Sequence, residues 1–356
     1  MLSVPEVGMR NSRFDRKAAL DLFTNCDLLE LGEMANKLRY QKHPQPEVTF
    51  AIDRNINYTN ICECQCRFCA YYRKPEDADA FLIDYPTLHQ KIAETIALGG
   101  TQILLQGGLH PDLKIDYYVG LLKTIKDDFP TIHIHGFSPP EIAHIAKSSN
   151  LDLSATIKEL MVAGLGSIPG GGAEILDDRV RSAISPNKIG WQRWLEVMEC
   201  AHNLGLRTTA TMMFGSLETP EELIEHLFRV REVQDRTLGF TAFIPWSFQP
   251  DNTDLGQEVK QTATGIDYLR VLALSRLVLD NIDNLQASWV TQGTKMAQAA
   301  LYFGANDFGS TMIEENVVAA AGAHFSISLK ELVDTIKEAG FKPWQRDTLY
   351  NLLKEF

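Results

Sequence analysis

The stretch "NYTNICECQCRFCAYYR", residues 57–73, contains four cysteines within eight positions. They are Cys62, Cys64, Cys66 and Cys69. The chain has no apolar segment behind its N-terminal charges, so we expect no secretory signal and a cytoplasmic location. In a reducing compartment, clustered cysteines are more often metal ligands or catalysts than disulfides.

Outward from this stretch, apolar or β-branched runs alternate with amphipathic helical patterns. The runs lie at 47–53, 102–108, 131–137, 165–171, 207–215, 240–246, 285–290 and 306–310. Helical patterns lie between them, for example at 86–99, 116–129 and 190–205. Repeated strand–helix units with continuous apolar strands predict a parallel sheet covered by helices. Eight such units predict an α/β fold of the (β/α)8 TIM-barrel type.

The sequence on either side of these units divides the chain into three expected parts. An N-terminal helical segment covers 1–46, with a helix, a turn and a second helix over 14–39. The barrel covers 47–310. A helical tail over 311–356 packs on the barrel, with helices at 330–341 and 346–356.

Composition excludes two classes of partner. The chain has 356 residues and a formal net charge of −12, without a run rich in Lys or Arg. Binding to nucleic acid or to an anionic membrane surface is therefore not expected. No apolar run approaches the roughly 20 residues that a membrane helix needs.

Three cysteine spacings compete. Cys62 and Cys64, with one residue between them, form a poor chelate by themselves. Cys66 and Cys69 alone form a redox or zinc half-site, but no second pair of ligands follows at zinc-knuckle spacing. Cys62, Cys66 and Cys69 together place three thiolates on one loop, which suits a 4Fe-4S cluster and leaves one iron without a protein ligand. Cys64 fits no cluster spacing and is interpreted as a bystander.

The pattern C-x3-C-x-aromatic-C, on the loop after the first barrel strand, resembles the radical S-adenosylmethionine (SAM) superfamily. This resemblance implies that Cys62, Cys66 and Cys69 hold the cluster and that the methionine moiety of SAM chelates the fourth iron. It further implies that electron transfer to the sulfonium yields a 5′-deoxyadenosyl radical.

The resemblance also implies contacts to SAM from later strand ends. Glycine at the end of 102–108 permits close backbone approach to the methionine amino group, and a carboxylate in "GGGAEI" can accept from the ribose hydroxyls. The segment "MMFGSLE" resembles a motif near the adenine. The expected SAM contacts are Phe68, Tyr71, Gln106, Gly107, Gly108, Ser138, Glu174, Gly215 and Glu218.

Motifs over residues 47–323 resemble one family in particular, the cyclic dehypoxanthinyl futalosine synthases of menaquinone biosynthesis. They include "GGLHP", "HGFSP", "GGGAEIL", "FIPWSFQP" and "MIEENVVAAAG". The implied reaction is removal of the ribose C4′ hydrogen, attack of the carbon radical on the carboxyphenyl ring, and loss of a proton and an electron. Aminofutalosine synthases and deazaflavin-forming synthases share much of the pattern and remain alternatives.

Such a reaction needs a base near the ring and donors for the substrate carboxylate. At the strand ends, the catalytic candidates are His110, His135 and Arg54. The candidates for substrate binding are Asn57, Trp246, Ser247, Phe248, Gln249, Asp307 and Glu314. Each has an ordinary structural alternative, such as a histidine that satisfies a backbone carbonyl or an acid that caps a helix.

The implied partners are a nucleoside-derived small molecule and an external one-electron reductant of the flavodoxin or ferredoxin type. Two readings from other classes remain open at this point. One is a cluster-carrying electron-transfer or scaffold protein with four protein ligands, and the other is a zinc-binding module.

Overall fold

A computed structural model describes residues 13–356. The strand that leads to the cysteines is split into β1 (Glu47–Ala51) and β2 (Asn55–Asn57). β2 begins a parallel sheet that runs β2-β3-β4-β5-β6-β7-β8. β1 pairs with β9, and an isolated bridge between Gln286 and Asp307 joins β9 to the segment after β8. Counting β1 and β2 as one strand, eight parallel strands close into a barrel.

The barrel strands match the eight predicted runs. After the split strand they are β3 (Gln102–Gln106), β4 (His133–Gly136), β5 (Ser167–Ile168), β6 (Arg207–Phe214), β7 (Phe240–Ser247), β8 (Asn284–Leu285) and β9 (Asp307–Ser310). The predicted run 285–290 is shorter as a strand, because Trp289 begins the helix α11 (Trp289–Gln292). The (β/α)8 prediction is confirmed.

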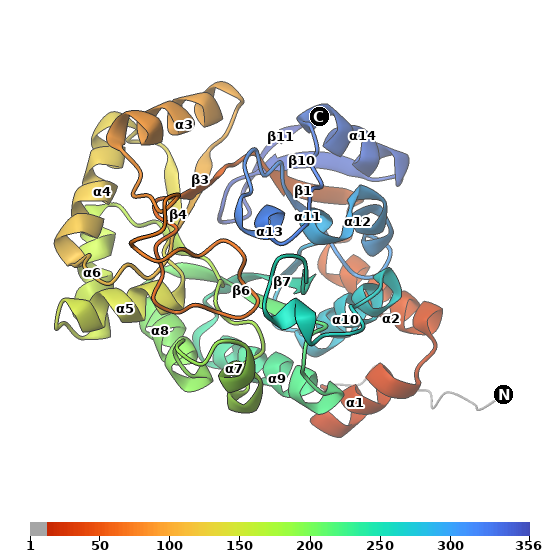
Figure 1. Ribbon diagram of the computed structural model, residues 1–356. Coiled ribbons are helices and arrows are strands. Elements are labelled where there is room, and N and C mark those ends of the chain that lie inside the picture. The colour runs from red at the N-terminus through yellow and green to blue at the C-terminus, as the bar shows by residue number, and fades with distance from the viewer. Residues whose placement is uncertain (1–12) are drawn as a thin grey trace.

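Helices surround the strands (Figure 1). They are α3 (Tyr85–Ala97), α4 (Ile115–Asp128), α5 (Pro139–Ser148), α6 (Leu153–Ala163), α7 (Asp178–Ile184), α8 (Trp191–Asn203), α9 (Pro220–Thr237), α10 (Gly265–Val278), α12 (Thr294–Ala300) and α13 (Val317–Ala320), with a 3₁₀ turn at Leu255–Gln257. Several begin at side-chain caps: Asp84 accepts from the Thr87 amide, and Thr219 and Glu222 form a capping box. No helix within residues 13–356 has the length and apolar character to cross a membrane.

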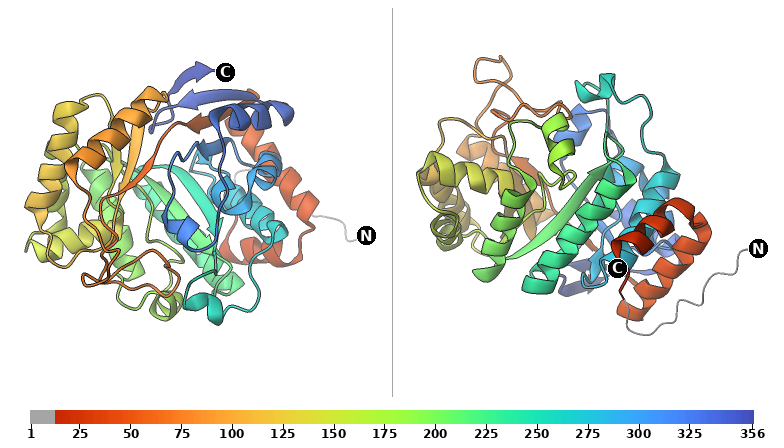
Figure 2. Two further views of the ribbon diagram at one scale, coloured as in Figure 1. Left: turned by 45° about the horizontal axis from the view of Figure 1, so that its top comes forward. Right: turned by 90° about the horizontal axis from the view of Figure 1, so that it is seen from below.

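The predicted N-terminal pair of helices is present as α1 (Arg16–Asn25) and α2 (Leu28–Lys42), with Cys26 in the turn between them. α1 packs on α9, and α2 packs on α10, so the pair covers the outside of the barrel (Figure 2). The part of the predicted segment before residue 13 lies outside the described residues.

The helical tail was predicted correctly only in part. α14 (Leu329–Glu338) confirms the helix expected at 330–341, but the helix expected at 346–356 is wrong. There the chain forms β10 (Lys342–Arg346), parallel to β1, and β11 (Leu352–Glu355), antiparallel to β10. The apolar spacing near the C-terminus fits a helix, but a free edge of β1 and a turn closed by Asp347 favour strands.

A buried ion pair joins this added strand to the barrel. Arg346 donates from Nε and Nη2 to the two oxygens of Asp307, at 2.5 and 3.0 Å. Thr49 Oγ1 and the Gly309 amide also donate to Asp307, at 2.6 and 2.9 Å. Asp307 is fully buried. Its carboxylate therefore ties β1, β9 and β10 together, and the expected contact with substrate stays a prediction.

Replacing Asp307 should destabilise the fold strongly. Asp307→Ala leaves the Arg346 guanidinium buried without its partner, which should lower the free energy of unfolding by about 3–5 kcal/mol. Asp283→Ala is the matched control, because the ion pair of Asp283 with Lys42 is solvent-exposed and its loss should cost less than about 1 kcal/mol. Urea denaturation measures both. Equal effects in the two variants would contradict the structural role of Asp307.

Candidate active site

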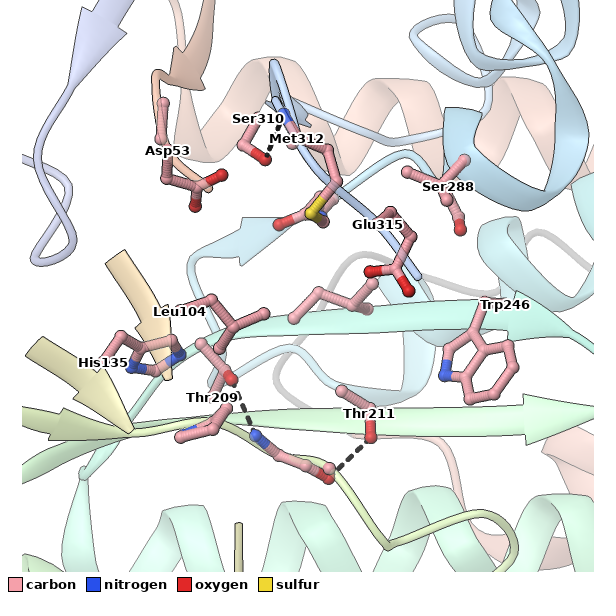
Figure 3. A pocket seen from close by; sticks show the side chains of 18 of the residues that line it. Asp53, Leu104, His135, Thr209, Thr211, Trp246, Ser288, Ser310, Met312 and Glu315 are labelled. Carbon is pink, nitrogen blue, oxygen red and sulfur yellow. Dashed lines mark hydrogen bonds between the residues drawn. The ribbon is translucent and has the colours of Figure 1, made fainter. Parts of the chain in front are cut away.

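Two adjoining cavities lie at the carboxyl ends of the strands and inside the barrel. The cluster cavity, about 200 Å³, is enclosed by the cysteine loop, the end of β3 and the start of α5. The barrel cavity, about 270 Å³, is lined by inward-facing residues of the strands (Figure 3). Gln106 and Gly172 line both cavities. A ligand in one cavity therefore lies beside a ligand in the other.

Backbone hydrogen bonds hold the cysteine loop over the mouth of the barrel. The amides of Cys62, Glu63 and Arg67 donate to the carbonyls of Arg73, Leu109 and Ile184, respectively, at 2.9–3.0 Å. These contacts fix the loop to segments that are far apart in the sequence. All four cysteines of the loop line the cluster cavity.

Cys64 differs from Cys62 and Cys66. Its side chain is buried and donates to the Asn187 carbonyl at 3.6 Å, and the Asn187 amide group returns a bond to the Cys64 carbonyl. Hydrogen bonds with Cys62 and Cys66 raise the pKa of the Cys64 thiol, and the same bonds lower the pKa of Cys62 and of Cys66. Cys62 and Cys66 are therefore more readily deprotonated than Cys64, and the thiolate is the form that binds metal. Burial raises the pKa of Cys69.

Glycine is required where β3 passes under the cysteine loop. A Cβ on Gly108 would lie 2.1 Å from the Ile61 carbonyl oxygen, and a Cβ on Gly107 would lie 2.6 Å from the Tyr58 ring. Buried Glu141 fixes the same segment by accepting from the Gly107 amide at 2.9 Å and from Tyr58 Oη at 2.9 Å. The backbone of "QGG" thus stays bare and close to the cluster cavity.

Buried charges lie next to the cysteines. Lys188 Nζ donates to Glu174 at 3.1 Å, and Arg181 lies 3.4 Å from the other oxygen of Glu174. Lys188 also stacks on Phe68, 4.9 Å from its ring centre. The Cys66 and Glu174 charges raise the pKa of Lys188 although burial opposes them. Glu174 has a φ of +41°, in the left-handed region that non-glycine residues seldom adopt.

The donor set fits a 4Fe-4S cluster better than a single ion. Within residues 13–356, no group of three His, Cys, Asp or Glu side chains is placed to hold one metal ion. In a cluster each thiolate binds a different iron, so the sulfurs of Cys62, Cys66 and Cys69 do not have to converge. The bare backbone of Gly107 and Gly108 and the Lys188–Glu174 pair offer partners for a charged amino-acid ligand.

The barrel cavity is lined by polar and aromatic side chains that alternate along the strands. Asp53, Thr209, Thr211 and Trp246 point into it, with His135 on the wall that β4 contributes (Figure 3). Burial lowers the pKa of His135 to about 3, so its imidazole is neutral and weakly basic. Its Nδ1 shares a hydrogen bond of 2.6 Å with Ser167 Oγ.

Sequence comparisons agree with this geometry. The model of the radical SAM superfamily matches residues 56–230, and the model of the CofH/MqnC C-terminal region matches residues 237–355. A cyclic dehypoxanthine futalosine synthase of Halalkalibacterium halodurans is 46% identical, covering 99% of this chain and 94% of that protein.

The chain belongs to the radical SAM superfamily, in the family of the cyclic dehypoxanthine futalosine synthases.

The chain is also similar to proteins with other names. A 5-amino-6-(D-ribitylamino)uracil–L-tyrosine 4-hydroxyphenyl transferase of Methanococcoides burtonii is 43% identical, over 91% of this chain and 92% of that protein. The crystal structure of methylornithine synthase (PylB) has a TM-score of 0.72 at 17% identity, covering 94% of this chain and 95% of that chain, and supports the fold alone. As a radical SAM enzyme, the chain with the cysteine loop Cys62–Cys69 uses a 4Fe-4S cluster and SAM.

The structure brings most of the predicted cofactor residues of this radical SAM enzyme together. Those that line the cluster cavity are Cys62, Cys66, Cys69, Phe68, Tyr71, Gln106, Gly107, Gly108 and Ser138, with Asn57 from the substrate set. Glu174, His135 and Trp246 line the barrel cavity. Their individual roles remain predictions.

Nine other predicted residues lie outside the two cavities. They are Arg54, His110, Gly215, Glu218, Ser247, Phe248, Gln249, Asp307 and Glu314. Arg54 donates to Glu94 at 2.9 Å, and Glu314 accepts from Lys91 at 2.5 Å. Glu218 accepts from the amides of Gly215 and Ser216, which closes the turn after β6. These contacts give several of them structural roles, and their functional roles stay predictions.

The sequence reasoning missed several residues that the structure places at the site. Lys188 lies in a loop without any motif, and only its contacts with Glu174 and Phe68 in the folded chain reveal it. Thr209, Thr211 and Asp53 carried a usable signal: the threonines alternate along one strand, and the aspartate ends the first predicted run.

Serine substitutions of two cysteines in the loop should have different effects on the cluster. Cys66→Ser should abolish cluster assembly and activity because a ligand thiolate is lost, whereas Cys64→Ser should retain the cluster because that thiol is a hydrogen-bond donor. Iron and sulfide content after anaerobic reconstitution measure both. A full cluster in Cys66→Ser, or none in Cys64→Ser, would show that the ligand set is different.

Replacing Gly108 should also reduce cluster assembly. Gly108→Ala pushes a Cβ against the Ile61 carbonyl and should displace the loop, so that less cluster is assembled per chain. Gly120→Ala, in α4, is the control: its Cβ meets no atom within 4 Å, and alanine favours a helix by about 0.5–1 kcal/mol. Normal iron content in Gly108→Ala would contradict the close approach of β3 and the loop.

Proposed function

We propose that this radical SAM enzyme cyclises dehypoxanthine futalosine to cyclic dehypoxanthine futalosine, in menaquinone biosynthesis. The two cavities adjoin at Gln106 and Gly172, and this carries the proposal, because a substrate in the barrel then lies beside SAM. The choice of this substrate is supported by the 46% identity to the synthase of Halalkalibacterium halodurans over 99% of the chain.

When bound, the cluster and SAM supply a 5′-deoxyadenosyl radical. The residues of the chain then have two tasks. The Lys188–Glu174 pair and the bare backbone of Gly107 hold the cofactor over the barrel. Trp246, Thr209 and Thr211 form the walls that press the carboxyphenyl ring of the substrate toward C4′.

The reaction forms a bond between C4′ and a ring carbon. The C4′ hydrogen leaves as an atom, the carbon radical adds to the ring, and the ring then loses one proton and one electron to become aromatic again. The enclosed barrel excludes other hydrogen donors from the radical. We propose that a flavodoxin or ferredoxin in the cytoplasm supplies the priming electron.

A second candidate is radical transfer of a hydroxyphenyl group. It is favoured by the 43% identity to the transferase of Methanococcoides burtonii, only slightly below that to the synthase. An aminofutalosine synthase activity is a third candidate, from the shared cluster motif. All three use the same radical and differ only in what occupies the barrel cavity.

Anaerobic incubation distinguishes these candidates. The reconstituted chain receives SAM, a reductant and one of three substrates: dehypoxanthine futalosine, an enolpyruvyl benzoate, or tyrosine with 5-amino-6-(D-ribitylamino)uracil. We expect a product two hydrogens lighter than dehypoxanthine futalosine by mass spectrometry, and none in Cys66→Ser. Coupling of tyrosine or addition to the benzoate, without cyclised product, would contradict the proposal.

A further inference from the structure

We infer that Asp53 is the catalytic base that removes the ring proton when the cyclised intermediate becomes aromatic. This inference rests on the proposed function, which requires a proton acceptor near the carboxyphenyl ring. Asp53 is the second residue after β1, lines the barrel cavity and is 5% exposed. Figure 3 shows its carboxylate pointing toward the interior of that cavity.

One oxygen of Asp53 is free to accept a proton. Gln102 Nε2 donates to Oδ2 at 2.8 Å, which orients the carboxylate, but Oδ1 is buried without a hydrogen-bond partner. A buried acceptor without a donor is costly, and such groups need an explanation in a native structure. A substrate C–H or O–H group brought into the cavity would supply the missing donor.

The other acidic side chains that line the cavity are already engaged. Glu174 is paired with Lys188 and Arg181. Glu315 accepts from Asn55 Nδ2 at 2.8 Å and from the Val317 amide at 2.7 Å, so both of its oxygens are used. Within residues 13–356, Asp53 is therefore the carboxylate at this cavity that keeps an unpartnered oxygen.

The surroundings of Asp53 also make it a stronger base than an ordinary aspartate. Burial raises its pKa, the neighbouring Ser310 hydroxyl, the Gln102 hydrogen bond and the Arg346 charge oppose this, and the nearby Asp307 charge adds to the rise. His135, the histidine on the same cavity, has a pKa of about 3 and is a weaker acceptor. A base is most effective when its pKa is near the working pH.

Asp53 accepts the ring proton after the C4′ radical has added to the ring. Addition of the C4′ radical to the ring leaves the attacked carbon with four single bonds, one of them to hydrogen. Breaking that C–H bond sends the proton to Asp53 Oδ1 and the electron pair into the ring. One electron then leaves to a one-electron acceptor, either the oxidised iron–sulfur centre or an external carrier, and the ring is aromatic again.

The ratio of cyclised product to 5′-deoxyadenosine tests this role. Hydrogen abstraction precedes the proton transfer, so Asp53→Asn should still form 5′-deoxyadenosine when SAM, reductant and dehypoxanthine futalosine are supplied. Cyclised product should fall by about 100-fold or more, the usual contribution of a general base. Freeze-quenched samples of the variant should accumulate an organic radical in electron paramagnetic resonance spectra.

A control variant separates a base from a merely structural carboxylate. Glu315→Gln makes the same chemical change at the same cavity and should keep the wild-type ratio. An unchanged ratio in Asp53→Asn, or an equal loss in Glu315→Gln, would overturn the inference.

Rescue covers the case in which Asp53→Asn folds poorly. Asp53→Ala leaves space for a small carboxylate, so added formate should restore the ratio. If neither variant forms 5′-deoxyadenosine and formate restores nothing, Asp53 is structural and the inference is wrong. Wild-type enzyme that makes 5′-deoxyadenosine but no cyclised product would instead contradict the proposed function.

Discussion

The rest of the structure depends on how the first barrel strand is paired. Its lower half, β1, lies between β9 and β10, whereas its upper half, β2, pairs with β3. The break at residues 52–54 lets one strand serve both arrangements. It turns the Asp53 side chain into the barrel and leads the chain directly into the cysteine loop. Closure of the barrel and placement of the cluster ligands therefore follow from one constraint.

The central architecture could be predicted from sequence because its signals are local. Apolar runs give the strands, and the spacing of Cys62, Cys66 and Cys69 gives the cluster. The C-terminal strands could not be predicted, because the 346–356 pattern fits a helix and only the free edge of β1 decides otherwise. Pairing across the barrel outweighs local preference there.

The site shows the same division. Residues beside a backbone signal, such as Gly107 and Gly108, were found, because a bare backbone is needed where the loop lies close. Residues placed by tertiary contacts gave no such signal. Arg54 follows a strand and donates to Glu94, and Lys188 has no motif but lies between the cysteines and Glu174. Strand position predicts the level of a side chain in the barrel, but not its partner.

The central claim is that SAM in the cluster cavity acts on a ribose held in the barrel cavity. Transfer of deuterium from dehypoxanthine futalosine labelled at C4′ tests it most directly, by mass spectrometry of the 5′-deoxyadenosine formed in one turnover. We predict that 5′-deoxyadenosine carries the deuterium and that the cyclised product has lost it. Unlabelled 5′-deoxyadenosine formed together with cyclised product would contradict the account.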